Sequence, residues 1–208
     1  MTSIELNDEQ VQFLKEQRDG RLRELDAEID QYARTVLEDV NLKLTSKYKQ
    51  IEINMSRADV NFGLYVERLS TKIDYRLKPH LYCYWDKTYH IGYERTFHLF
   101  LGLYYRENQW GCSIPFDIAL KVMKSLDGYD GDIELYDENL IEICKGDFSD
   151  WLKQNETLDK RVIYTYIGQY LRPEDYKGME LDDLIFNDLS FFIDKLTPLL
   201  IEESKAMK

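Results

Sequence analysis

The apolar pattern of residues 96–106, TFHLFLGLYYR, limits the fold more than any other feature of this chain. In an extended conformation one face of this segment would carry Phe97, Leu99, Leu101, Leu103 and Tyr105, and the other face would carry Phe100 and Tyr104. A strand that is apolar on both faces is normally buried on both sides. The segment therefore predicts a central strand of a sheet that other elements cover on both sides.

Shorter runs with a period of two surround this segment. Between about residues 60 and 114 these runs are VNFGLYVERL, KIDYRL, HLYCYW, YHIGYE and WGCSI, and further along they are DIELY, LIEI and VIYTYIGQYL. Alternation of this kind, separated by turn residues, predicts short strands in a meander and a later hairpin. The aromatic content of 13% also favours a substantial sheet.

The two ends of the chain show helical periodicity instead. Leu22, Leu25, Ile29, Tyr32 and Val36 are spaced by three and four residues. We predict one long helix, or two helices broken near Gly20, from Asp8 to Tyr48, in which Leu25, Ile29, Val36 and Val40 are buried. This helix either packs on its own domain or forms a dimerising coiled coil that would make a homodimer. The first interpretation is favoured, because the strict heptad lasts only about two repeats. A second amphipathic helix is predicted from Leu181 to Glu203.

These elements together predict an α+β fold. Its antiparallel sheet would have about six or more strands, covered by the long N-terminal helix and the amphipathic C-terminal helix. We divide the chain into an N-terminal helical segment, residues 1–50, and an α+β domain, residues 51–208, whose C-terminal half is acidic.

The negative charge of the chain is concentrated in its second half. Residues 111–208 contribute −10 of the formal net charge of −12, and the stretch 127–150 holds nine carboxylates against Lys145 alone. Such a surface repels phosphate groups and attracts cationic partners. We therefore expect no direct contact with nucleic acid and no membrane partner, and instead a basic protein surface as the partner.

The candidate partner-binding residues lie on and beside the predicted hairpin. They are Asp130, Asp132, Glu134, Asp137, Glu138 and Glu142. A three-residue loop, 137–139, would pair Leu135 with Ile141 and would place Glu134 directly opposite Glu142. Like charges in that position destabilise a sheet, so a basic residue of this chain, a divalent cation or a partner would have to offset them.

The metal interpretation leads to an alternative function. Asp132, Glu142 and Lys145 resemble the metal-binding arrangement of PD-(D/E)XK nucleases, which implies a metal-dependent nuclease or hydrolase that uses Asp132, Glu134 and Glu142. That family places its acid and its lysine one residue apart, whereas the run Glu142-Ile143-Cys144-Lys145 puts them on opposite faces of a strand. We therefore expect no catalytic residue, no metal and no cofactor.

The cysteines and the N-terminus indicate the compartment. Cys83, Cys112 and Cys144 form no CxxC motif and fall in strand-like runs, so we expect buried free thiols in a reducing cytoplasm. The N-terminus is polar and acidic, so we expect no secretory signal. The predicted function is that of a non-catalytic intracellular binding protein, such as an immunity protein, an antitoxin or a phosphate-mimicking inhibitor of a nucleic-acid-binding enzyme.

Overall fold

The computed structural model describes residues 7–57, 61–89, 95–106, 114–172 and 175–207. Within them the helices are α1 (Asp8–Lys47), α2 (Phe116–Ser125), α3 (Phe148–Gln154) and α4 (Leu181–Ala206). The strands are β1 (Glu52–Arg57), β2 (Asn61–Arg68), β3 (His80–Tyr89), β4 (Arg95–Arg106), β5 (Asp132–Tyr136), β6 (Glu142–Asp147) and β7 (Tyr164–Leu171). The predicted α+β class is confirmed.

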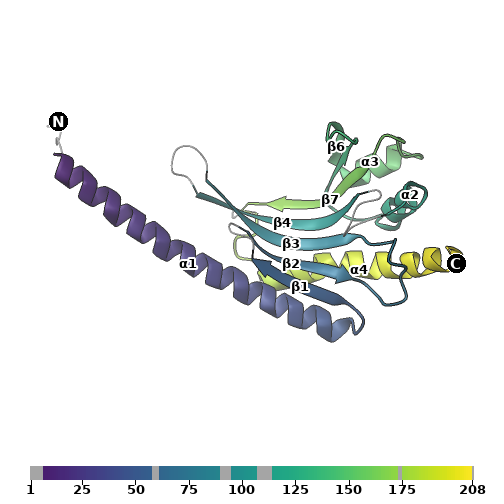
Figure 1. Cartoon of the computed structure of the whole chain (residues 1–208), viewed down its shortest axis with the longest axis horizontal. Helices are drawn as coiled ribbons and strands as arrows, with labels where there is room; N and C mark the ends of the chain where they lie inside the picture. The colour runs from purple at the N-terminus through teal and green to yellow at the C-terminus, as the bar shows by residue number, and fades with distance from the viewer. Residues whose placement is uncertain (1–6, 58–60, 90–94, 107–113, 173–174, 208) are drawn as a thin grey trace.

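The strands of the described residues form one antiparallel sheet in the order β1-β2-β3-β4-β7-β5-β6. β4 pairs with β3 on one side and with β7 on the other, which confirms the central position predicted for residues 96–106. The predicted cover on both faces of the sheet is wrong for the described residues, because the buried strand residues lie on one face while Tyr82 and Tyr84 on the other face are partly exposed. The pairing of β4 with β7 also brings the C-terminal hairpin β5–β6 into the same sheet as the meander β1–β4 (Figure 1).

The hydrophobic core lies on one face of this sheet. Its strand residues are Leu64, Val66, Leu81, Cys83, Ile133, Leu135 and Ile167. Its helix residues come from the second half of α1, from α2, from Phe148 of α3 and from α4. Burial of a leucine or phenylalanine side chain contributes about 1.5–3 kcal/mol, so this face contains most of the apolar stabilisation. None of the helices in the described part of the chain has the length and apolarity needed to cross a membrane.

The helix predictions agree with the structure. α1 begins after Asn7, whose side-chain oxygen accepts a hydrogen bond from Gln10 N at 2.8 Å, a favourable N-cap. Val36 and Val40 are buried as predicted, whereas the side chains of Leu25 and Ile29 lie outside the described part of α1. α4 begins at Leu181 as predicted and extends slightly beyond Glu203.

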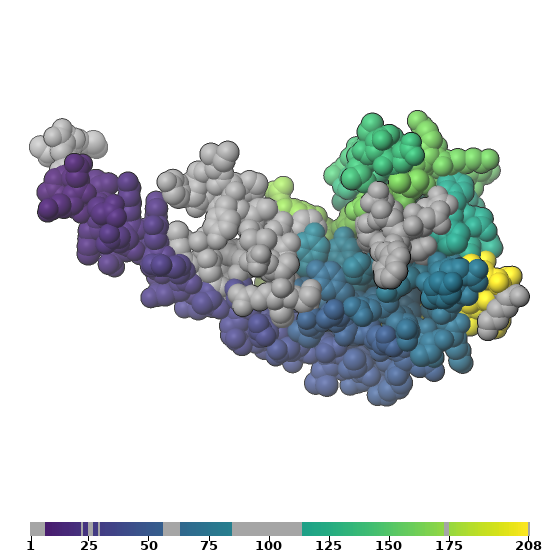
Figure 2. Space-filling model, in the orientation of Figure 1, coloured from purple at the N-terminus to yellow at the C-terminus, as the bar shows by residue number. Residues whose placement is uncertain are grey.

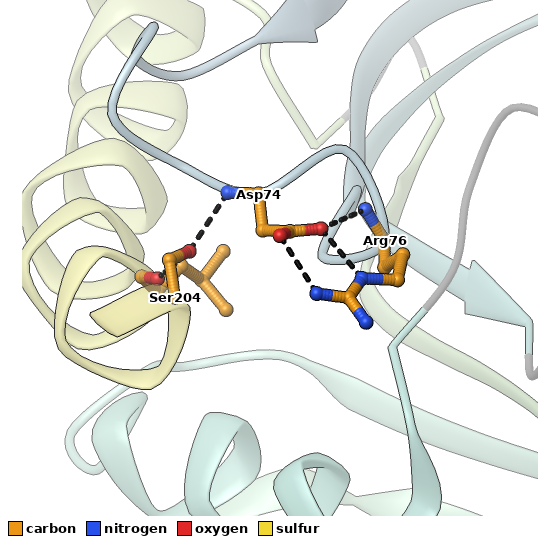
Figure 3. A network of polar contacts seen from close by, with 4 residues as sticks. Asp74, Arg76 and Ser204 are labelled. Atoms are coloured by element: carbon orange, nitrogen blue, oxygen red, sulfur yellow. Dashed lines mark hydrogen bonds and ion pairs between the residues drawn. The ribbon is translucent and has the colours of Figure 1, made fainter. Parts of the chain in front are cut away.

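The strand predictions fail at two places. β1 was not predicted, and residues 72–77, KIDYRL, form turns between β2 and β3 rather than a strand. Asp74 explains these turns, because its carboxylate accepts hydrogen bonds from the backbone and guanidinium of Arg76 (Figure 3). The Asp74 N–H also donates to Ser204 Oγ at 2.8 Å, which fixes the turns to α4. The runs predicted at residues 90–94 and 110–113 lie outside the described residues.

Candidate functional site

The face of the sheet opposite the core is rich in tyrosine. Alternation along β2, β3 and β7 places on this face Tyr65, His80, Tyr82, Tyr84, Tyr164, Tyr166 and Tyr170. The rings contact one another, since the centroids of Tyr82 and Tyr84 are 5.4 Å apart and those of Tyr65 and His80 are 5.2 Å apart. Contacts at such distances contribute about 0.5–1.5 kcal/mol each. We call this surface the tyrosine face.

Two glycines leave the middle of the tyrosine face without side chains. Gly102 of β4 is the register partner of both Tyr82 and Gly168, and Gly168 of β7 is the partner of Asp132. One row across four neighbouring strands therefore consists of Tyr82 on β3, Gly102 on β4, Gly168 on β7 and Asp132 on β5. Because glycine has no Cβ, the two middle positions of this row add no side chain between Tyr82 at one end and Asp132 at the other.

A hollow of about 590 Å³ lies on this face. Its lining consists of Tyr82, Tyr84, Asp132, Glu134, Lys145, Tyr164, Tyr166, Tyr170 and Arg172. Two of the predicted site residues, Asp132 and Glu134, therefore lie beside tyrosines that the sequence interpretation had assigned to the sheet alone. The alternation of tyrosines in β3 and β7 was visible in the sequence, but the pairing that brings these strands next to β5 was not.

The predicted register of the β5–β6 hairpin is wrong. Glu134 pairs with Lys145, not with Glu142, and Leu135 pairs with Cys144, not with Ile141. An ion pair therefore replaces the expected repulsion, because Lys145 Nζ donates a hydrogen bond to Glu134 Oε1. A basic residue of this chain offsets the charge of Glu134.

The reason for this register is a longer loop than predicted. Asp137 N–H donates to the Ile141 carbonyl oxygen at 3.0 Å, and Asp137 Oδ1 accepts hydrogen bonds from the N–H groups of Asn139 and Ile141. Leu140 adopts a left-handed conformation with a φ of 59°. Leu140 and Ile141 are exposed, so the assumption that Ile141 faces the core was the error.

Hydrogen bonds hold Glu134 in its charged form. Partial burial raises the pKa of Glu134, but hydrogen bonds from Lys145 and Tyr136 outweigh this effect and lower the pKa overall. The Tyr136 hydroxyl donates to Glu134 Oε2 at 2.7 Å, and this bond raises the pKa of Tyr136. Burial raises the pKa of Tyr166, whose Oη has no hydrogen-bond partner among the described residues.

The six predicted partner-binding residues do not form one site. Asp132 and Glu134 line the hollow, and Glu142 is exposed opposite Tyr136 on β5. Asp137 caps the hairpin loop, and Glu138 is exposed at its tip. Asp130, the sixth, is exposed just before β5 and its backbone carbonyl accepts a hydrogen bond from the Gln169 side chain.

The structure also bears on the metal ligands of the alternative interpretation and on the cysteines. In the described ranges, no group of three or more His, Cys, Asp or Glu side chains is arranged to hold a metal ion. Cys83 is free and buried as predicted, and burial raises the pKa of its thiol. Cys144 is free but only partly buried, and Cys112 lies outside the described residues.

Comparison with known proteins finds no matching family model, no matching curated protein and no matching solved structure.

Proposed function

We propose that this chain is a non-catalytic binding protein whose tyrosine face receives a basic segment of a partner protein. The observation that carries the proposal is the hollow, which combines five tyrosine rings of β3 and β7 with the carboxylate of Asp132. Such a surface can contact the aliphatic part of an arginine or lysine side chain and its charge at the same time.

The tyrosine rings supply the first half of this recognition. The face of an aromatic ring attracts a cation, with about 0.5–1 kcal/mol at exposed sites and about 2 kcal/mol where water is excluded. Tyr82, Tyr84 and Tyr170 are partly or fully exposed, so their rings are accessible to a partner. Arginine suits this surface better than lysine, because its planar guanidinium stacks on aromatic faces.

The carboxylates supply the second half. Asp132 pairs in register with Asp147 on β6, and no residue within the described ranges forms a salt bridge with Asp132. Glu134, in contrast, is already paired with Lys145. A basic side chain of the partner would therefore meet Asp132 at the acidic end of the row. Arg172 lines the hollow as well and would oppose that cation.

The net charge of the whole chain favours the same class of partner. Single-stranded nucleic acids also stack on aromatic sheet surfaces, but they need a positive field along their phosphates. A formal charge of −12 repels phosphate and speeds the approach of a basic protein. We therefore place the chain among proteins that bind and neutralise a basic partner, as an immunity protein, an antitoxin or an inhibitor of a nucleic-acid-binding enzyme does.

The compartment belongs to the same proposal. Cys83 on β3 and Cys144 on β6 are free thiols, and free thiols persist best in a reducing environment. This supports an assignment to the cytoplasm.

The test is a titration with three unstructured peptides of equal length, in which every second residue is arginine, lysine or glutamate. Binding is measured by calorimetry and by tyrosine fluorescence. The arginine peptide is expected to bind most tightly and the glutamate peptide not at all. Asp132→Asn is expected to weaken binding about fivefold or more, because it removes the carboxylate at the acidic end of the row. The matched control is Asp127→Asn, an equally exposed carboxylate outside the hollow.

Two further variants separate the aromatic and electrostatic contributions. Tyr170→Ala is expected to weaken binding by a few-fold through the lost ring contact, at roughly 0.5–1 kcal/mol. Arg172→Gln is expected to tighten binding, because it removes a like charge from the lining. Equal affinities of the parent protein and Asp132→Asn, or tighter binding of a single-stranded oligonucleotide than of the arginine peptide, would overturn the proposal.

A further inference from the structure

α1 consists of two parts with different surroundings. From Ala33 to Leu44 it contributes five residues to the core, whereas none of the described side chains between residues 8 and 32 is buried. This N-terminal part, residues 8–32, extends away from the sheet and the other helices (Figures 1 and 2). We call it the projecting helix.

Residues 33–44 form the core-packing part of α1, and the apolar stripe of this part continues along the projecting helix. The residues of this stripe follow one another at steps of three or four along the chain. They are apolar at positions 36, 32, 29, 25, 22, 14 and 11, and the basic Arg18 lies between positions 22 and 14. Such steps keep all these positions on one side of a helix. The stripe leaves the core between Val36, which is 7% exposed, and Tyr32, which is 55% exposed. Leu14 is also largely exposed.

A helix of this length needs a partner for its apolar side. An isolated helix is only marginally stable in water, and most helical stability comes from packing of an apolar face. Gly20 lowers the helix propensity further, by about 1 kcal/mol relative to alanine. Salt bridges such as Arg21–Glu24, at 3.0 Å, contribute only a few tenths of a kcal/mol on an exposed helix.

The charges of the projecting helix fall into two blocks. Residues 15–23 contain four basic and two acidic residues, Lys15, Arg18, Arg21, Arg23, Glu16 and Asp19. Residues 24–30 contain four acidic residues and no basic one, Glu24, Asp26, Glu28 and Asp30. The first block is thus net basic and the second is strongly acidic.

We propose that the projecting helix forms an antiparallel pair with the same helix of a second copy of this chain. An antiparallel arrangement places the basic block of each copy beside the acidic block of the other, and it keeps the two sheets at opposite ends of the pair. A parallel arrangement would instead place the two acidic blocks side by side. The apolar stripe would form the seam, because steps of three and four residues are those of helix pairs.

The test measures the mass of the full chain in solution by sedimentation and light scattering over a range of protein concentrations. A dimer is expected, and its dissociation constant should rise with salt because opposite charges face each other. Leu14→Glu introduces a charge into the stripe at a residue that is exposed in the single chain, and it is expected to shift the protein to a monomer. A protein that is monomeric at all concentrations would overturn the proposal.

Charge variants test the antiparallel arrangement. Arg21→Glu with Arg23→Glu makes both blocks acidic and is expected to raise the dissociation constant about tenfold or more. Glu24→Lys with Glu28→Lys neutralises the acidic block and is expected to weaken the pair less. An equimolar mixture of the two double variants should restore a dimer. Dimerisation that strengthens with added salt would indicate a parallel pair and would contradict the proposal.

The matched control is Glu38→Lys with Asp39→Lys. Both residues are exposed on the core-packing part of α1, and the charge change equals that of the second double variant. This control is expected to dimerise as the parent does. Circular dichroism of every variant at a concentration where it is monomeric separates a lost pair from a lost fold, because the core-packing helices keep their signal when only the pair is lost and lose it when the chain unfolds.

Discussion

The two faces of the sheet are made by the same strands and have opposite character. In β3, Leu81 and Cys83 are buried in the core, while Tyr82 and Tyr84 on the other face line the hollow. In β5, Ile133 and Leu135 are buried, while Asp132 and Glu134 line the same hollow. The leucine-rich face contains the buried core that stabilises the fold, and the tyrosine face is the surface for which we propose a binding role.

Two carboxyl groups on the two sides of the sheet show the same contrast. Glu134, on the tyrosine face, is held charged by Lys145 and Tyr136, and its pKa is lowered. Asp188, partly buried on α4 at the core side, accepts one hydrogen bond within the described part of the chain, from the Tyr129 hydroxyl at 3.2 Å. Burial raises the pKa of Asp188 to about 7, so the two groups should affect stability with opposite dependence on pH.

The largest expected effect comes from truncating adjacent residues of β3. Leu81→Ala leaves a cavity in the core and should lower the free energy of unfolding by about 3–5 kcal/mol. Tyr82→Ala removes a partly exposed ring and its contacts with Tyr84 and Tyr65, at roughly 1–2 kcal/mol. Urea unfolding of both variants measures the difference. Equal losses would show that the tyrosine face is as important for stability as the core face.

Asp188 should make the free energy of unfolding depend on pH. The pKa of Asp188 is about 7 in the folded chain against an ordinary value of 3.8, so the folded state binds the proton more tightly. Stability should therefore fall as pH rises from about 4 to about 8, by up to about 4 kcal/mol at 1.36 kcal/mol per pKa unit. Burial keeps the neighbouring Tyr129 and Cys83 neutral over this range, because it raises the pKa of each well above its ordinary value.

Asp188→Asn is the variant that isolates this effect. It should unfold at a higher urea concentration than the parent at pH 8, and much of the pH dependence between pH 4 and pH 8 should disappear. Glu202→Gln, an exposed carboxylate on the same helix, is the control and should leave the pH dependence unchanged. A parent protein whose stability rises steadily over this range would contradict the assignment.

The smallest expected effect is the coupling between Glu134 and Lys145. Both side chains are partly exposed, so a double-mutant cycle with Glu134→Gln and Lys145→Gln should give about 0.5–1 kcal/mol at pH 7. Because the folded-state pKa of Glu134 is lowered, this contribution is present above its ordinary pKa and is lost as pH falls through the lowered value. Thermal unfolding at pH 7 and at low pH measures both quantities.

A second cycle checks the hairpin register. Glu142→Gln combined with Lys145→Gln should give a smaller coupling free energy than the Glu134–Lys145 cycle, because Glu142 pairs with Tyr136 in the structure. A larger coupling of Lys145 with Glu142 than with Glu134 would show that the register is different from the one described.

Local signals in the sequence were sufficient for most elements. The proline at position 115 before α2, the Asp147 side chain that accepts from Asp150 N at 2.7 Å, and the periodicity of α4 all act over one or two turns of chain. Such interactions are visible in sequence because both partners are close in the chain. The same holds for the strands whose apolar and polar residues alternate.

The candidate site depends on interactions that are distant in the chain. The lining of the hollow depends on the insertion of β7 between β4 and β5, which places the tyrosines of β7 beside Asp132 and Glu134. Periodicity does not determine that strand order. The hairpin register was missed for a different reason, since apolar residues were assumed to face the core and Ile141 is exposed in the loop. Two of the six carboxylates predicted to bind a partner thus line the hollow, whereas its tyrosines were not predicted as site residues.

The central claim is that the tyrosine face binds the partner. Its most direct test is a map of backbone amide chemical shifts of the isotope-labelled chain on addition of the arginine peptide. The account predicts that the shifts centre on Tyr82 and Tyr84 of β3, Tyr166 of β7 and Asp132 of β5. Shifts confined to residues 137–141 at the tip of the acidic hairpin, with the tyrosine face unchanged, would contradict it.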